Sequence, residues 1–242
     1  MRDHQFSPSF DPRAPRSRSS IRAMFDSIAH RYDFLNHLLS AGMDRRWRRE
    51  GIRRLGVAPG ACILDIAAGT GDLALSALKG RPSLVVGVDV SREMLIRGRE
   101  KFDGVRTPVM PVQAGVEDLP FPAERFDAAM VAYGVRNFAD IQRGLEEVFR
   151  VLKPGGKFLV LEFSQPRMPV VRQLYFLYFN YLLPLVGRIF SRSSFAYTYL
   201  PKSVGNFPSP EEFIALLKES GFREAAWKPQ TFGISILYLA TK

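Results

Sequence analysis

The residues best placed to do chemistry lie where a hydrophobic run passes into a glycine-rich turn. Residues 63–72 read Ile-Leu-Asp-Ile-Ala-Ala-Gly-Thr-Gly-Asp. Gly69 and Gly71 let the backbone approach a ligand where side chains would collide, and the N-terminus of a following helix offers unpaired N–H groups to a carboxylate. Asp89 ends the next hydrophobic run, where an acidic side chain can accept hydrogen bonds from both hydroxyls of a ribose. Together these features predict a ligand of the adenosine type at the carboxyl edge of a sheet.

The dinucleotide-binding fingerprint G-x-G-x-x-G is absent, because alanines occupy its first and last glycine places. The spacing instead resembles the class I methyltransferase pattern, whose ligand, S-adenosylmethionine, carries an amino-acid tail in place of a pyrophosphate. In that pattern Asp65 helps to orient the ammonium group of the tail, and the backbone near Thr70 its carboxylate. The alternative is that the two glycines only shape a tight turn, but the position of Asp89 favours cofactor binding.

The third hydrophobic run leads into Ala114-Gly115-Val116-Glu117-Asp118, where methyltransferases usually hold the adenine edge. The N–H of Val116 is a plausible donor to an adenine ring nitrogen. Asp118 is equally compatible with an adenine contact and with an ordinary loop position.

Elements that alternate along the chain must position these residues. After Pro59 short β-branched runs are separated by segments of helical length, which indicates βαβ units and a mainly parallel sheet. We expect strands at residues 62–67, 84–89, 108–114, 126–132 and 157–163. We expect helices at residues 72–79, 92–101 and 141–152, and the last of these should end in the turn Lys153-Pro154-Gly155-Gly156.

The two ends of the chain depart from this alternation. Residues 1–20 are predicted to be a disordered basic tail, and a transit peptide is the less favoured interpretation. Residues 21–242 should form a single domain, with a helical cap at 21–56 and an aromatic insertion at 166–205. A closing helix is expected at 211–219, before an antiparallel strand pair at 224–228 and 234–240.

Composition limits the alternatives further. The 242 residues suffice for one sizeable core, and the formal charge of +10 favours an anionic partner such as nucleic acid, acidic lipid or a charged substrate. The single cysteine excludes an internal disulfide and a multi-cysteine zinc site, and we predict no metal site. The most apolar stretch, residues 170–190, is interrupted by four polar residues and by Pro184, so we expect no spanning helix.

Beyond these local signals, residues 22–242 resemble the quinone C-methyltransferase family of menaquinone and ubiquinone biosynthesis. The segments that carry the resemblance are Met24-Phe25-Asp26-Ser27-Ile28-Ala29, Arg31-Tyr32-Asp33 with Asn36, Asp44-Arg45-Arg46-Trp47, Tyr133-Gly134-Val135-Arg136-Asn137, Leu161-Glu162-Phe163-Ser164 and Tyr199-Leu200-Pro201. The most specific of them are Gly134–Asn137 and Arg31–Asp33 with Asn36. The Lys153–Gly156 turn occurs in many methyltransferases and is less diagnostic.

The resemblance implies a Rossmann-like α/β fold of class I, with a mainly parallel seven-stranded sheet and an antiparallel final strand. It implies S-adenosylmethionine as cofactor, with contacts at Thr70, Asp89, Gly115 and Val116. Position 115 is a departure, because the family commonly has Asn or Asp there, and a side-chain bond to the adenine amino group is therefore lost.

The implied reaction methylates a ring carbon of an isoprenoid quinol, demethylmenaquinol above all. Arg136 would stabilise a phenolate oxygen, Asn137 would hold the same oxygen, and Tyr32 would close over the cofactor. The alternatives are a structural ion pair for Arg136 and helix packing for Tyr32. A histidine on a helix, such as His37, is more often packed or solvated than catalytic.

The partners follow from the same considerations. The aromatic insertion suits an isoprenoid tail, and the six arginines between 45 and 54 suit anionic headgroups, so we expect a cytoplasmic protein in peripheral contact with the inner face of the membrane. A homodimer is compatible with the sequence. A benzoquinol methyltransferase, an RNA methyltransferase and a non-catalytic cofactor-binding scaffold stay open as alternatives, although no nucleic-acid motif is evident.

Overall fold

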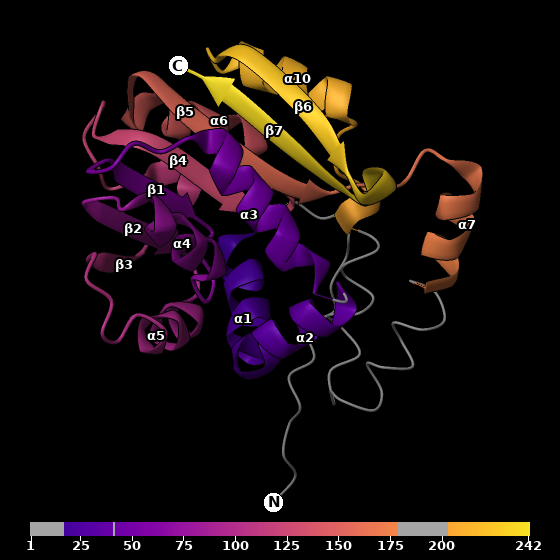
Figure 1. The fold of residues 1–242 in the computed structure, drawn as a ribbon, viewed down its shortest axis with the longest axis horizontal. Coiled ribbons are helices and arrows are strands. Elements are labelled where there is room, and N and C mark those ends of the chain that lie inside the picture. The colour runs from indigo at the N-terminus through magenta and orange to yellow at the C-terminus, as the bar shows by residue number, and fades with distance from the viewer. Residues whose placement is uncertain (1–16, 41, 179–202) are drawn as a thin grey trace, which may run out of the picture.

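The computed structural model describes residues 17–40, 42–178 and 203–242, and a seven-stranded sheet forms its centre (Figure 1). The strand order is β3-β2-β1-β4-β5-β7-β6. The strands are β1 (Cys62–Ile66), β2 (Leu84–Asp89), β3 (Val109–Gln113), β4 (Phe126–Ala132), β5 (Leu152–Phe163), β6 (Arg223–Gln230) and β7 (Ser235–Thr241). The order reverses between β1 and β4, which is where open α/β sheets bind ligands.

The central strands are parallel and buried on both faces. Leu64 of β1 lies opposite Val86 of β2 on one side and Ala129 of β4 on the other. Strands covered on both faces need near-continuous apolar sequence, which is the pattern that these runs show. β7 pairs antiparallel with both β5 and β6, so the predicted seven-stranded class I fold and its final antiparallel pair are confirmed.

Helices cover both faces of the sheet (Figure 1). On one face, α3 (Met43–Leu55) and α4 (Asp72–Ala77) pack on the sheet through residues such as Trp47 and Leu73. On the other face, α6 (Ile141–Val151) and α10 (Pro210–Glu219) pack through residues such as Leu145 and Phe213. The other helices within the described residues are α1 (Arg18–Ile28), α2 (Tyr32–Leu39), α5 (Arg92–Glu100) and α7 (Pro169–Leu177), with short 3-10 turns between elements.

Two boundaries differ from the sequence-based expectation. α1 begins at Arg18, inside the segment predicted to be a tail, because Ser17 caps it by accepting a hydrogen bond from the Ser20 amide at 3.2 Å. The predicted turn at Lys153–Gly156 is instead the start of β5. There the pairing with β4 shifts from Phe126–Leu152 to Ala128–Lys157, which is a bulge that absorbs the extra residues.

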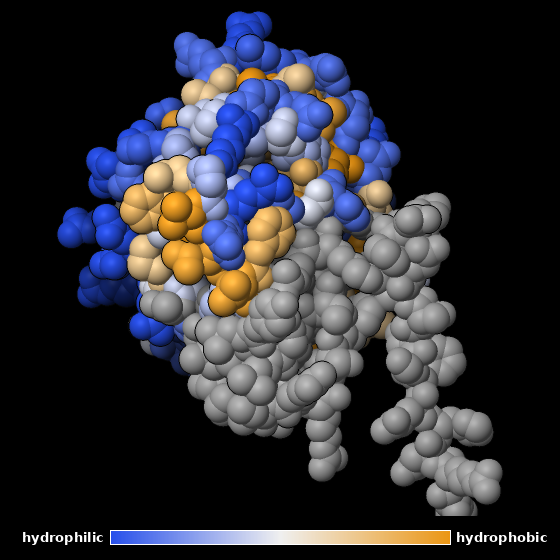
Figure 2. Space-filling view, turned by 90° about the vertical axis from the view of Figure 1, so that its right-hand side faces the viewer, coloured by the Kyte–Doolittle hydropathy of each residue, from blue (hydrophilic) through white to orange (hydrophobic). Residues whose placement is uncertain are grey.

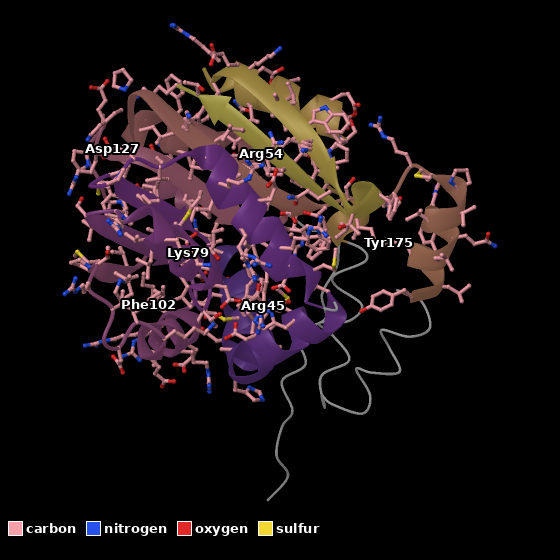
Figure 3. All side chains as sticks on the ribbon, in the orientation of Figure 1. Arg45, Arg54, Lys79, Phe102, Asp127 and Tyr175 are labelled. Carbon is pink, nitrogen blue, oxygen red and sulfur yellow. The ribbon has the colours of Figure 1, made fainter. Side chains whose placement is uncertain are left out.

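The predicted aromatic insertion is described only in part. Its first half contains α7, whereas residues 179–202, including Tyr181 and the Tyr199–Pro201 segment, lie outside the described residues. Tyr175 is the buried residue of α7, and Figure 3 shows it on the side of the helix that faces the sheet. Among the described residues, the helices are too short or too polar to cross a bilayer.

Candidate functional site

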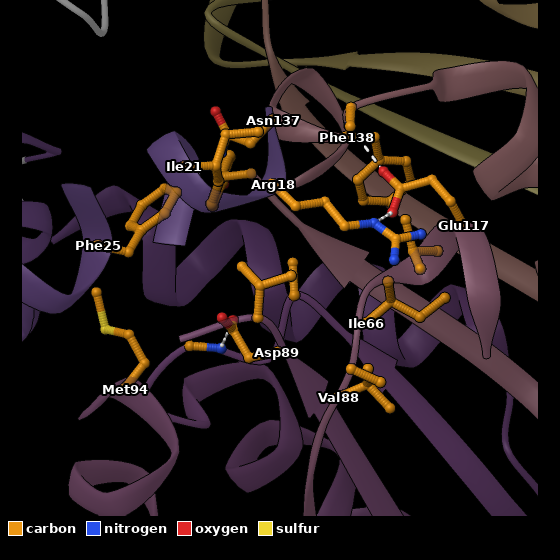
Figure 4. Close-up of a pocket in the computed structure, with 18 of the residues that line it drawn as sticks. Arg18, Ile21, Phe25, Ile66, Val88, Asp89, Met94, Glu117, Asn137 and Phe138 are labelled. Carbon is orange, nitrogen blue, oxygen red and sulfur yellow. Dashed lines mark hydrogen bonds and ion pairs between the residues drawn. The ribbon is translucent and has the colours of Figure 1, made fainter. Parts of the chain in front are cut away.

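A pocket with about 660 Å³ of space opens at the carboxyl edge of β1, β2 and β4, beneath α1 (Figure 4). Its base comes from the sheet and its loops, and its cover comes from the N-terminal helices. The residues that line it are Arg18, Ile21, Phe25, Tyr32, Ile66, Ala67, Gly69, Val88, Asp89, Val90, Met94, Ala114, Val116, Glu117, Ala132, Tyr133, Gly134, Asn137, Phe138 and Ala139.

Asp89 supplies the carboxylate of this pocket. One oxygen accepts a hydrogen bond from the Gly69 amide at 2.8 Å, and the other accepts one from the Ser91 amide at 2.8 Å. Burial raises the pKa of Asp89 to about 6. The two hydrogen bonds favour the charged form and so oppose part of this rise. Each carboxylate oxygen has a second lone pair, so the group can also accept from ligand hydroxyls.

The three predicted positions of the glycine-rich turn, Gly69, Thr70 and Gly71, lie in different surroundings. Gly69 lines the pocket with φ +55°, and a Cβ there would lie 3.7 Å from the Tyr32 ring. Gly71 lies outside the lining. It has φ +82°, and a Cβ there would lie 2.4 Å from Phe102, so only glycine fits. Thr70 is buried outside the lining, and its hydroxyl donates to Asp33 and accepts from Lys101 at 3.1 Å.

Asp65 also lies outside the residues that line the pocket. Its side chain is 1% exposed and accepts a hydrogen bond from the Ala74 amide of α4 at 3.1 Å. Burial raises the pKa of Asp65 to about 8. The carboxyl therefore holds the first turn of α4 behind the glycine-rich turn, and it is largely protonated near neutral pH.

An apolar slot occupies the side of the pocket next to β3. Val116 lines it together with Ile66, Val88 and Phe138. Gly115 is buried beside this slot, outside the lining. Asp118 is exposed and also outside the lining, which favours its reading as an ordinary loop residue. A flat aromatic base fits between such side chains.

Arg136 and Asn137 lie in a short turn after β4, but only one of the two lines the pocket. Asn137 lines the pocket. Arg136 does not, and its Nη1 pairs with the fully buried Glu162 at 2.6 Å and donates to the Tyr133 carbonyl. The second Glu162 oxygen accepts from the Arg136 amide at 3.2 Å. This buried pair fixes the turn, and thereby places Asn137 against the pocket.

Tyr32 enters the pocket from the start of α2. Burial raises its pKa, against the opposing effect of the Arg136 charge. The Arg136 charge also opposes the rise in the pKa of Tyr175, for which burial is the larger cause. The hydroxyls of two tyrosines from distant segments therefore lie within the field of one cation.

Ion pairs join the helical cap to α4 and to the end of α5. Lys101 at the end of α5 lies 2.5 Å from Asp33 and 2.8 Å from Asp72. His37, Asp44 and Asp72 bring ligand atoms within 4.8 Å of one another, a spacing that could hold a metal ion. Arg48 pairs with both Asp44 and Asp72, at 3.3 Å to Asp72, and Lys101 also pairs with Asp72, so protein cations already lie against both carboxylates.

Sequence reasoning missed several residues of the pocket. Arg18, Ile21 and Phe25 face it from α1 at positions three and seven residues apart, which is one face of a helix. This spacing was readable for Ile21 and Phe25, but nothing local indicated what they face. Glu117 and Glu162 lie in segments that the sequence analysis singled out, but nothing in the sequence indicated their partners, which are distant in the chain.

Solved structures with the same fold include a SAM-dependent methyltransferase from Aquifex aeolicus. It has a TM-score of 0.61 and 17% identity over 96% of this chain and 98% of that one. The [4+2]-cyclase SpnF has a TM-score of 0.67 and 16% identity over 93% and 97% of the two chains. Likeness at this identity shows the fold alone, and the cyclase illustrates that one fold supports different reactions.

Sequence relatives are much closer. The chain is 46% identical to the ubiquinone/menaquinone biosynthesis C-methyltransferase UbiE of Geobacter sulfurreducens, over 92% of this chain and 88% of the relative. It is 45% identical to a demethylmenaquinone methyltransferase of Chlorobaculum parvum, over 94% of both chains. The model of the ubiE/COQ5 methyltransferase family matches residues 14–242, and the chain belongs to that family.

Proposed function

We propose that this chain transfers a methyl group from S-adenosylmethionine to a ring carbon of an isoprenoid quinol, demethylmenaquinol, and so forms menaquinol. The main observation behind the proposal is a single pocket lined by Asp89, by the apolar slot around Val116 and by Tyr32. Membership of the ubiE/COQ5 family supports the reaction class, and the relatives named as quinone methyltransferases support the substrate class.

The residues of the pocket fit this cofactor. Asp89 would hold the ribose hydroxyls, and Gly69 leaves room for the amino-acid tail beside Tyr32. Val116 and Phe138 would enclose the adenine. When bound, the cofactor supplies an electrophilic methyl group on a positively charged sulfur.

The acceptor requires an electron-rich ring carbon, and ionising the neighbouring phenol makes that carbon more nucleophilic. The positive charge of Arg136 would favour the phenolate, and Asn137 would hydrogen-bond to the same oxygen. Because burial raises the pKa of Tyr32, its hydroxyl stays protonated near neutral pH. Tyr32 can therefore donate a hydrogen bond but not accept the proton, and we expect solvent water to take it.

A benzoquinol of the ubiquinone pathway is the second candidate substrate. It offers the same ring-carbon chemistry, and the relatives include proteins named for both pathways. An RNA methyltransferase and a non-catalytic scaffold are less favoured, because the relatives are named as quinone methyltransferases.

Peripheral membrane contact is also a proposal, and its basis differs from the sequence expectation. Of the six arginines in α3, Arg48 is buried in ion pairs, and Arg53 and Arg54 pair with Glu50. Exposed positions that remain for headgroups are Arg45, Arg46 and Arg49. Figure 3 marks Arg45 near the start of α3 and Arg54 near its end.

α7 offers the apolar counterpart to these charges. Its exposed apolar side chains include Val170, Leu174 and Leu177, which are 69%, 64% and 58% exposed. Figure 2 shows apolar side chains gathered on the side of the molecule where α7 lies. Exposed apolar surface of this kind marks a contact with a membrane or a partner.

The substrate is tested by offering purified protein and labelled S-adenosylmethionine three acceptors in parallel. We expect label in demethylmenaquinol, less in demethoxy-type benzoquinol and none in bulk RNA. A faster reaction with the benzoquinol would assign the chain to the other pathway. Label in RNA alone would overturn the proposal.

The role of Asp89 is tested by pH. Because burial raises its pKa to about 6, its charged fraction falls as the pH falls from 7 to 5, and S-adenosylhomocysteine binding should weaken over that range. Asp89→Asn should bind about 10- to 100-fold more weakly at pH 7, since a charged acceptor is lost, and should lose this pH dependence. Calorimetry measures both. An Asn variant with wild-type affinity would contradict the ribose contact.

The charge of Arg136 is separable from its packing role. Arg136→Ala alone should lower stability by about 3–5 kcal/mol, because it leaves Glu162 buried without its cation. The double variant Arg136→Met/Glu162→Leu removes both charges with similar volumes and should fold. If the cation stabilises a phenolate, the double variant binds S-adenosylhomocysteine but methylates quinol at least tenfold more slowly. Full activity in the folded double variant would limit Arg136 to a structural role.

Membrane contact is tested by flotation with liposomes that contain anionic lipid. We expect Arg45→Ser/Arg46→Ser/Arg49→Ser to float less than wild type, since each lost charge costs on the order of 1 kcal/mol at the surface. The matched control is Arg92→Ser/Arg97→Ser/Arg99→Ser, which changes three exposed arginines of α5. If both triple variants and the wild type stay equally unbound, the membrane proposal is wrong.

A further inference from the structure

The helix α1 lies across the mouth of the pocket (Figure 4). Ile21 is its single fully buried residue, and it lines the pocket together with Phe25. Met24, Phe25 and Ile28 are only partly buried. Polar contacts at both ends of α1 add to this apolar contact.

At its first turn, α1 is joined to the loop after β3 by an ion pair. The Nε of Arg18 donates to one oxygen of Glu117 at 2.9 Å. The other oxygen of Glu117 accepts from the Ala139 amide at 2.7 Å. Glu117 is 9% exposed at its side chain and Arg18 is 46% exposed, so the carboxylate is fixed within the pocket wall and the guanidinium closes onto it.

Gly115 is the position that admits the Arg18 side chain. A Cβ at 115 would lie 2.8 Å from the Nε and 2.9 Å from the Cζ of Arg18. The backbone of Gly115, at φ −88° and ψ 149°, is one that any residue adopts. The absence of a side chain at 115 therefore serves the approach of Arg18, and the guanidinium occupies the space beside the apolar slot.

The other end of α1 is held in the same way by a different loop. Asp26 accepts a hydrogen bond from the Ser91 hydroxyl at 2.5 Å, and the Ser91 amide donates a hydrogen bond to Asp89. Both ends of the helix are thus joined by polar contacts to loops that form the pocket, and these contacts must break before the helix can lift.

We propose that Arg18 is a further residue of the cofactor pocket. Its side chain occupies the space left by Gly115 and closes the adenine end of the pocket. Through its ion pair with Glu117, Arg18 slows release of the bound cofactor. The inference rests on the proposed function, because it takes the apolar slot beside β3 as the adenine site. It assigns a binding role to a residue within the segment that the sequence predicted to be a disordered tail.

The test uses the full chain and S-adenosylhomocysteine as the probe. Arg18→Ala removes the guanidinium. Glu117→Gln keeps an oxygen for the Ala139 amide but turns an NH₂ group towards Arg18, so it breaks the ion pair with little other change. The charge-matched control is Arg97→Ala, an exposed arginine on α5. The dissociation rate is measured by stopped-flow competition at low and at high sodium chloride.

We expect each single variant to release the probe about three- to tenfold faster than wild type at low salt, and the double variant to add little, because both changes delete one contact. High salt should bring wild type towards the variants, since a partly exposed ion pair is screened. Hydrogen exchange of the α1 amides without ligand should also speed up in both variants and not in Arg97→Ala.

Equal release rates for wild type, Arg18→Ala and Glu117→Gln would overturn the inference while leaving the proposed function intact. Additive effects in the double variant would also overturn it, because the two residues would then act separately. A wild-type protein that fails to bind the probe would instead overturn the proposed function itself.

Discussion

The hydrogen bond from the Gly69 amide to Asp89 is the contact on which the pocket depends. It joins the loop after β1 to the end of β2, and the second oxygen of the same carboxylate holds the Ser91 amide. One buried side chain therefore sets the distance between two loops that come from separate βα units. Because both amides point at the carboxylate, the group stays partly charged in a buried position, where an isolated charge would be expelled.

A second buried charge holds the turn after β4. Glu162 lies near the carboxyl end of β5 and has no exposed surface. Arg136, in the turn after β4, forms an ion pair with it and neutralises its charge. Two apolar residues would stabilise the fold at least as well as this pair. The pair instead places a positive charge that opposes the rise in the pKa of Tyr32 and of Tyr175. In the proposed reaction this charge would favour a phenolate.

The sequence predicted the sheet well because its central strands are buried on both faces. Such strands need continuous apolar runs, and those of β2 and β4 match their predicted limits to the residue. Reasoning from the strand ends located Gly69, Asp89 and Val116, whereas Asn137 and Tyr32 came from the family resemblance; all five line the pocket. It could not locate Arg18 and Glu117, because their contact joins positions 99 residues apart and depends on the space left at Gly115. It placed Asp65 in β1 and Thr70 in the turn that follows, but their side chains face α4 and the cap.

The polar attachment of the cap follows from what the pocket has to do. A helix sealed over a ligand by a large apolar face would give up on the order of 25 cal/mol for each square ångström exposed when it opened, and release would be slow. α1 fully buries one side chain, and Arg18 and Asp26 join it to the loops of the pocket, as Asp33 joins α2. Ion pairs and hydrogen bonds exchange with water as they break, so each such contact adds only a small amount to the free energy that holds the cap in place. Each of these contacts ends on a different loop of the pocket, after β1, β2 or β3, so the position of the cap is coupled to the positions of all three loops.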